Sequence, residues 1–278
     1  MDAGELLQRY ANGERDFRGV SLPSAFLGGA NLSGANLREA DLGGANLIGA
    51  DLTRTNLREC NLGDSHLEAN LTEANLIGSD LSGSNLTGAI LRNASLRAAN
   101  LKGAVLKAVD LSYAVLSEAD LRDTDLSRAR LTECNLGRAK LMNAILTEAD
   151  LQGANLTYAI LMGANLESAN LSDAILNGVN ATNVNASNID LSRAKLSSAN
   201  LANINLKGAN LRAAHITWTT LRGADLSEAK LYRAQLCWSN LTGAKLVEAI
   251  LIDANLNEAN FRNADLRGAV MPNAGSTE

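Results

Sequence analysis

Residues 30–42 read Ala30-Asn31-Leu32-Ser33-Gly34-Ala35-Asn36-Leu37-Arg38-Glu39-Ala40-Asp41-Leu42. Every fifth residue is a leucine, which follows an Asp or Asn and, before that, a small residue. Centred on this leucine position, pentapeptides run from Phe17 to Leu67 and again from Leu71 to Met271. The first run holds 11 pentapeptides and the second holds 41, so 52 pentapeptides account for nearly all of the 278 residues.

A period of five fits neither a straight helix nor a straight strand. On an α-helix each step of five residues turns by about 140°, which would spread the leucines around all sides. On a strand an odd spacing would place alternate leucines on opposite faces. All the leucines can point inward only if the chain turns once per pentapeptide, which predicts an all-β solenoid.

The motif resembles that of the pentapeptide-repeat family: a small residue, Asp or Asn, Leu, then two variable residues. The resemblance covers about residues 15–273. It implies a right-handed quadrilateral β-helix, in which four pentapeptides make one coil and 52 pentapeptides make about 13 coils. The leucine and the small residue would then face inward, and the other three residues would face water.

The two ends of the repeat predict different structures. Residues 1–14 predict a short N-terminal capping α-helix, because Asp2 and Glu5 form a capping pair and Gly13 ends an apolar stripe. This start resembles cyanobacterial members of the family. Residues 274–278 lack apolar periodicity and predict a C-terminal tail. Some family members dimerise through this end, whereas Pro272 lacks the donor that strand pairing requires, so monomer and dimer both remain open.

Composition excludes several classes of protein. Basic residues number 25 and acidic residues 30, for a net charge of −5, which argues against direct nucleic-acid binding. No stretch is apolar enough to cross a membrane and the first residues are not those of a secretory signal, so we expect a cytoplasmic protein. Three widely spaced cysteines indicate reduced thiols rather than a disulfide framework.

The sequence predicts no catalytic, cofactor or metal site. The only two histidines, His66 and His215, would lie about seven coils apart and cannot act together. Cys60 should point inward and His66 outward, which leaves no set of metal ligands. Carboxylate pairs one coil apart arise from the motif itself. We therefore expect a protein that is not an enzyme.

Two departures from the repeat are expected to be structural. Leu67 and Leu71 are four residues apart, which predicts a tightened corner. At Val179/Ala181 and again five residues later, the centre shrinks to Ala while the small position grows to Val. This exchange conserves the volume of the inward pair, so we expect the core to stay filled.

The outward residues fall on four faces when pentapeptides are assigned in rotation, with face 1 beginning at Phe17. Over the whole chain, faces 1 to 4 carry net charges of +1, 0, −3 and −1. Trp218 and Trp238 lie twenty residues apart on face 1, in the same outward position of successive coils. The pair either stabilises the sheet as a cross-strand ladder or forms a binding hot spot. The candidate protein-binding residues are Trp218, Trp238, His215 on the same face, Tyr232 at its corner, and Glu228 and Glu248 on the most acidic face, face 3.

A regular surface without a pocket is suited to binding another protein, whose identity the sequence does not reveal. The resemblance to cyanobacterial members, one of which modulates heterocyst differentiation, implies a regulator of signalling or cell differentiation. A rival hypothesis comes from family members that imitate DNA and modulate DNA gyrase or topoisomerase. That hypothesis requires a dense acidic stripe, and no face carries one. A purely structural role is a third alternative.

Overall fold

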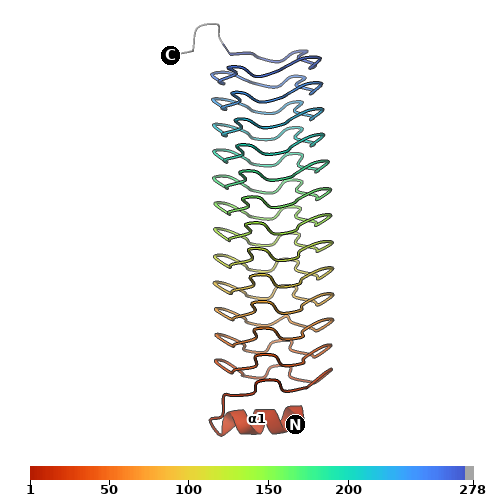
Figure 1. Cartoon of the computed structure of the whole chain (residues 1–278), viewed down its shortest axis with the longest axis vertical. Helices are drawn as coiled ribbons and strands as arrows, with labels where there is room; N and C mark the ends of the chain where they lie inside the picture. Colours follow the sequence, from red (N-terminus) through yellow and green to blue (C-terminus); the bar gives the residue numbers. More distant parts are fainter. Residues whose placement is uncertain (273–278) are drawn as a thin grey trace. The chain divides into compact units, whose positions relative to one another are not determined.

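The structure is a computed structural model that describes residues 1–272, in two compact units, Met1–Lys140 (unit 1) and Leu141–Glu278 (unit 2). Each unit is a stack of near-identical turns of chain (Figure 1). The one named element is the helix α1, Ala3–Ala11; isolated parallel bridges, rather than extended strands, join the turns. No helix among residues 1–272 is long and apolar enough to cross a membrane. The predicted tail, 274–278, and the last residue assigned to the repeat, 273, lie outside the described residues.

The bridges show that one turn of chain takes four pentapeptides. In unit 1, Asn36 pairs with Asn56, and in unit 2, Asn185 pairs with Asn205, in each case twenty residues further along. Each pentapeptide therefore lies directly against the one four repeats later. The four faces are, from here on, the four stacks of pentapeptides related in this way.

The corner between two pentapeptides explains the motif. At Leu27, for example, the carbonyl oxygen accepts a hydrogen bond from the N–H of Ala30 at 3.1 Å, and Gly29, the third residue of this turn, has φ 68°. This is a type II turn. The Asx residue before the centre closes the turn, as where Asp51 Oδ1 accepts the N–H of Thr53 at 3.0 Å. Asp or Asn recurs because its side chain satisfies this backbone donor.

The core is the expected narrow aliphatic column. Within each unit the central leucines and the preceding small residues are buried, most of them fully. Cys60 and Cys134 occupy small inward positions and are buried as predicted. Burial raises the pKa of the Cys60 thiol to about 12, so this sulfur remains a protonated, apolar group at neutral pH.

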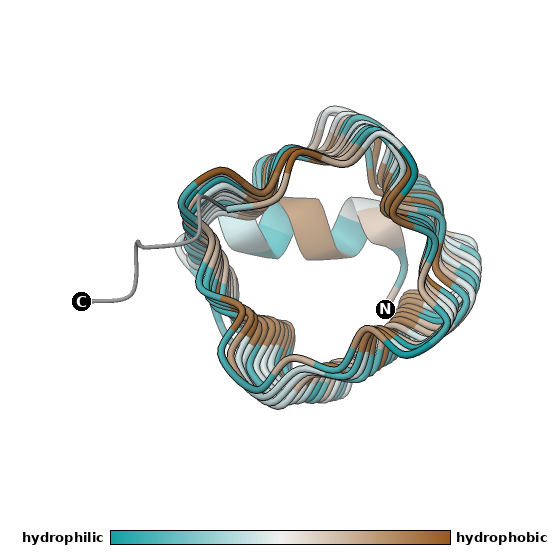
Figure 2. Cartoon of the chain, turned by 90° about the horizontal axis from the view of Figure 1, so that it is seen from above, coloured by the Kyte–Doolittle hydropathy of each residue, from teal (hydrophilic) through white to brown (hydrophobic). Residues whose placement is uncertain are grey.

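Helix α1 lies across the first turns of unit 1 (Figure 2). As predicted, Asp2 is its N-cap and accepts the Glu5 N–H at 2.9 Å, and the chain leaves the helix through Gly13 with φ 95°. Leu6 is fully buried against the core, and the Tyr10 hydroxyl donates to the Ser33 carbonyl oxygen at 2.8 Å. The helix therefore closes this end of the core.

The four-residue step produces the predicted tightened corner. The N–H of Ala69 donates to the Leu67 carbonyl oxygen at 2.7 Å, a bond that spans one residue fewer than in the other turns. One oxygen of Glu68 accepts from the Asn85 side-chain amide at 2.5 Å, while its other oxygen is buried without a partner. The pairing then continues in register, as Asn56 meets Asn75 nineteen residues on.

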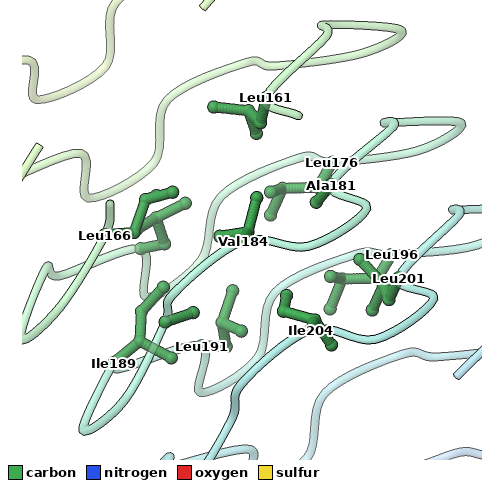
Figure 3. Close-up of a pocket in the computed structure, with 12 residues that line it drawn as sticks. Leu161, Leu166, Leu176, Ala181, Val184, Ile189, Leu191, Leu196, Leu201 and Ile204 are labelled. Carbon is green, nitrogen blue, oxygen red and sulfur yellow. The ribbon is translucent and has the colours of Figure 1, made fainter. Parts of the chain in front are cut away.

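The expectation of a filled core at the Val/Ala exchanges was wrong. A cavity of about 20 Å³ lies in unit 2, lined only by apolar side chains that include Ala181, Val184 and Ala186 (Figure 3). A Val/Ala pair has one side-chain carbon fewer than an Ala/Leu pair, and the valine methyls end closer to the backbone than leucine δ-methyls do. The exchange therefore fills the periphery and leaves the axis underpacked.

Candidate protein-binding site

Trp218 and Trp238 occupy the same corner of successive turns in unit 2, between faces 1 and 2. Each is the third residue of its corner turn and has positive φ, 57° for Trp218 and 61° for Trp238. In the same column two turns earlier, Gly178 adopts this conformation with φ 66°. The left-handed region costs a side-chain-bearing residue roughly 1–2 kcal/mol relative to glycine. Two indoles thus stand where the local backbone favours glycine.

The two indole rings form a parallel stack on the surface. Their centroids lie 5.2 Å apart and their planes differ by 4°. Trp218 is 64% exposed and Trp238 is 52% exposed, so stacking hides only part of each ring. The bridges that join successive turns set this spacing, because they hold the two backbones at strand separation.

Buried hydroxyl groups support the corner from inside. The small inward position after each tryptophan is Thr219 or Ser239 rather than the usual Ala, and both are buried. Thr219 Oγ1 donates to the Leu196 carbonyl oxygen at 2.5 Å, and Ser239 Oγ donates to the carbonyl oxygen of Ile216. These bonds reach one turn back along the chain and fix the backbone that carries the indoles.

The structure places the other candidate residues in two groups. His215 is exposed on face 1, where it bridges to Lys195 on one side and Gln235 on the other. Tyr232 is half-buried at the far corner of that face, in a hollow shared with Arg212, Arg233 and Asp253. His215 therefore shares the face of the tryptophan pair and Tyr232 lies at the opposite corner of that face, whereas Glu228 and Glu248 lie exposed on face 3 and take no part in the aromatic site.

Three of the six carboxylates on face 3 of unit 2, Asp225, Glu228 and Asp265, pair with a lysine or an arginine. Lys207 Nζ lies 3.1 Å from Glu228, and Arg267 lies 2.7 Å from Asp265. The Arg267 guanidinium and its backbone N–H lower the pKa of Asp265, which keeps the pair ionised well below neutral pH. Such pairing weakens the acidic field that a DNA mimic would need.

Face 1 of unit 2 is poor in charge. From Ala154 to Trp238 its pentapeptides contain no carboxylate and one lysine, Lys195, and Glu258 is the next charged residue on it. Aromatic residues are enriched and charged residues depleted at the centres of protein interfaces. The residues around the tryptophan pair are likewise poor in charge, and the pair itself is aromatic.

An exposed phenylalanine also escaped the sequence analysis. Phe26, on face 3 of unit 1, is 73% exposed and lies near Ile48, which is 47% exposed. It stands at the Asx position of its pentapeptide, an outward position, so the register of the motif was a sufficient signal. Unlike the tryptophan pair, Phe26 has no stacked aromatic partner among the described residues.

No three metal-ligating side chains come together among residues 1–272. The two histidines belong to different units, His66 to unit 1 and His215 to unit 2. His66 is exposed, with its Nδ1 4.0 Å from a Glu68 oxygen.

A family model described as pentapeptide repeats (8 copies) matches ten segments of the chain, which together span residues 16–268. HetL, a pentapeptide repeat protein involved in heterocyst differentiation regulation in the cyanobacterium Nostoc sp. strain PCC 7120, is 33% identical, with 99% of each chain covered and a TM-score of 0.33. QnrB1, a plasmid-mediated fluoroquinolone resistance protein, is 22% identical over 72% of this chain and 90% of its own, with a TM-score of 0.39. Rfr23 from the cyanobacterium Cyanothece 51142 is 30% identical over 42% of this chain and 63% of its own, with a TM-score of 0.18. No curated protein matches the chain.

Pentapeptide repeat proteins fold into right-handed β-helices and are typically non-catalytic scaffolds. The matched repeats cover more than half of the chain, and the identity to HetL extends along its whole length. The chain belongs to the pentapeptide repeat family.

Proposed function

We propose that this protein is a non-enzymatic scaffold and that it binds another protein through the tryptophan corner of unit 2. The observation that carries the proposal is the parallel, solvent-exposed stack of Trp218 and Trp238 on a face almost free of charge. Trp is enriched at the centres of interfaces, where its large rigid surface is desolvated at low entropic cost. We propose about thirteen quadrilateral coils for the chain. Within unit 2, the ladder between successive turns would present that surface in a fixed geometry.

The biological role we propose is regulation of signalling or cell differentiation through such contacts, in the cytoplasm. The support for this role is the identity of 33% to HetL, over 99% of both chains. The fit of the DNA-mimic alternative is poorer, because the carboxylates of face 3 in unit 2 are interrupted by lysines and an arginine.

The proposal also covers self-association. In the last described turn of unit 2, the inward centres Leu266 and Met271 are 36% and 39% exposed. A monomer would leave these side chains in water, whereas a dimer through this turn would bury them. Sedimentation of the wild type and of Met271→Asp decides between the two states.

The test of the binding site is capture of a partner from lysate of the source cell. Wild type is compared with Trp218→Ala/Trp238→Ala and with a control, Phe26→Ala, which also removes an exposed aromatic ring. We expect a partner that the double variant loses and the control retains. Capture of gyrase subunits equally by all three proteins would instead favour the DNA-mimic role.

A further inference from the structure

Charge is unevenly distributed around unit 2. Of the eleven carboxylates among residues 141–272, ten lie on faces 3 and 4, and Glu258 is the one on face 1 or face 2. Faces 1 and 2, which meet at the tryptophan corner, carry three cations instead: Lys195, Arg222 and Arg262. Charge totals over the whole chain hide this segregation, because face 1 of unit 1 contributes four of that face's five carboxylates.

Among residues 141–272, most of the other cations hold an ion pair, whereas these three cations do not. On faces 3 and 4 of unit 2, five of the seven cations hold an ion pair, such as Arg193 with Asp173 at 2.6 Å. Lys195, Arg222 and Arg262 hold none within the described part of the chain. Their charge is therefore available to a ligand.

Two of the free cations stand on either side of the indole stack. Lys195 is on face 1, in the column of His215 and one turn before it. Arg222 is on face 2, four residues after Trp218 in the same turn. A short chain segment crossing the corner would meet a cation, the two indoles and a second cation in succession. At physiological salt the Debye length is about 8 Å, so a cation acts on those charges of a bound segment that lie within this distance.

From this arrangement we infer that the partner presents an acidic segment, in which carboxylates meet Lys195 and Arg222 while an apolar or aromatic side chain packs on the indoles. The inference rests on the proposed function and adds the chemistry of the partner. An Arg guanidinium can hold a carboxylate with two hydrogen bonds, and neighbouring apolar surface excludes the water that would screen it.

A peptide fits this surface better than a nucleic acid. Three cations can neutralise only about three phosphates, and affinity for a nucleic acid depends on the number neutralised. Faces 3 and 4 of unit 2 carry ten carboxylates and seven cations, so they offer a long polyanion no net attraction beyond the corner. A segment with a few carboxylates between apolar residues requires no more positive charge than the corner supplies.

Intrinsic fluorescence measures binding at this corner directly, because Trp218 and Trp238 are the only two tryptophans of the chain. The full-length protein is titrated with a short synthetic peptide that repeats Glu-Glu-Phe and, separately, with one that repeats Lys-Lys-Phe. We expect the Glu peptide to change the emission in a saturable way, with an affinity that falls as salt is added. We expect the Lys peptide to bind at least tenfold more weakly.

Two charge-reversal variants make the assignment specific. Lys195→Glu/Arg222→Glu should weaken binding of the Glu peptide at least tenfold. The control, Lys207→Glu/Lys245→Glu, makes the same change in net charge on face 3 and should leave binding within about twofold. Circular dichroism of both variants establishes that each is folded.

The inference is overturned if the two peptides bind alike, if both double variants bind alike, or if a single-stranded oligonucleotide binds more tightly than the Glu peptide. Its failure can be told apart from failure of the proposed function. A captured partner that requires the tryptophans but tolerates Lys195→Glu/Arg222→Glu refutes the acidic segment alone. A partner that tolerates Trp218→Ala/Trp238→Ala refutes the binding site itself.

Discussion

At the scale of single residues, the repeat has two kinds of side chain: inward ones that stabilise the fold, and outward ones that contribute little to its stability. A central leucine is fully buried, and its loss would leave a cavity along the axis. An outward residue at the third position of a turn contributes little to packing and must adopt positive φ. The tryptophans are of the second kind, so their presence calls for an explanation other than folding.

We therefore predict that Trp218→Gly changes the free energy of unfolding by no more than about 1 kcal/mol. Loss of the stack costs about 0.5–1.5 kcal/mol, and relief of the positive φ returns a similar amount. By comparison, Leu236→Ala at a fully buried centre should cost about 2–5 kcal/mol. Thermal or denaturant unfolding measures both. A loss above about 2 kcal/mol for Trp218→Gly would make the pair a stabilising ladder rather than a binding surface.

The Asx position contributes stability that depends on pH where it holds a carboxylate. Arg122 donates to Asp120 through Nε at 2.7 Å, and this contact lowers the pKa of Asp120. A lowered pKa stabilises the folded state above the pKa of the unfolded chain, and the contribution disappears as pH falls through the folded value. Asp120→Asn, which keeps the turn acceptor, should cost about 1 kcal/mol at pH 7 after allowance for solvent screening.

Denaturant unfolding of the wild type and of Asp120→Asn from pH 7 to pH 2 measures the difference between their free energies of unfolding. It should shrink as pH falls below about 4, where the unfolded carboxyl becomes protonated. A difference that is the same at all pH values would show that the ion pair is not its cause.

At the scale of one turn, the sequence predicted the architecture because every pentapeptide repeats the same constraints. Leucine spacing, Asx closure and small inward residues all require the same corner, so one stretch of thirteen residues was enough to predict a β-solenoid. The number of pentapeptides in one turn came from the family resemblance. The prediction failed where it relied on volume rather than shape. Val184 with Ala186 fills less of the axis than Ala with Leu, and the periodicity does not contain that information.

Restoring the common pair should therefore stabilise unit 2. A cavity of about 20 Å³, at about 24 cal/mol per Å³, costs roughly 0.5 kcal/mol. Val184→Ala/Ala186→Leu adds one side-chain carbon, directed toward the axis, and should raise the free energy of unfolding by about that amount. The control is Ala154→Val, at a filled pair, which should overpack the core and lose about 1–3 kcal/mol. Destabilisation by the double variant would mean that the cavity cannot accept a leucine.

The candidate site could be predicted only in part from the sequence, for a related reason. Twenty-residue spacing placed Trp218 and Trp238 together, and the stack confirms that placement. The uneven distribution of charge in unit 2 could also be predicted from the sequence. It was missed because the charges of each face were summed over the whole chain, which combined unit 2 with unit 1. Which cations are free of ion pairs depends on side-chain geometry, as at Arg233, which lies 3.6 Å from Asp253.

At the scale of the whole chain, stability is a sum of contacts between neighbouring turns, because each turn packs only on the turns beside it. The open ends are then the weakest places, and α1 protects the first turns of unit 1 through the fully buried Leu6. We predict that Leu6→Asp releases the helix and opens unit 1 from this end, because an unpaired carboxylate cannot stay in the core.

Hydrogen exchange followed by mass spectrometry measures this opening. The amides of Phe17 and Leu22, which donate to the next turn at 2.8 and 2.7 Å, should lose protection first. Amides of unit 2 such as Leu226, which donates to Lys245 at 2.7 Å, should keep theirs, since no contact of theirs has changed. The control is Gln8→Asp, which places the same charge on the exposed side of α1 and should leave both units protected. Equal loss of protection at Phe17 and Leu226 in Leu6→Asp would show that the chain unfolds as one cooperative block, and the additive account of its stability would be wrong.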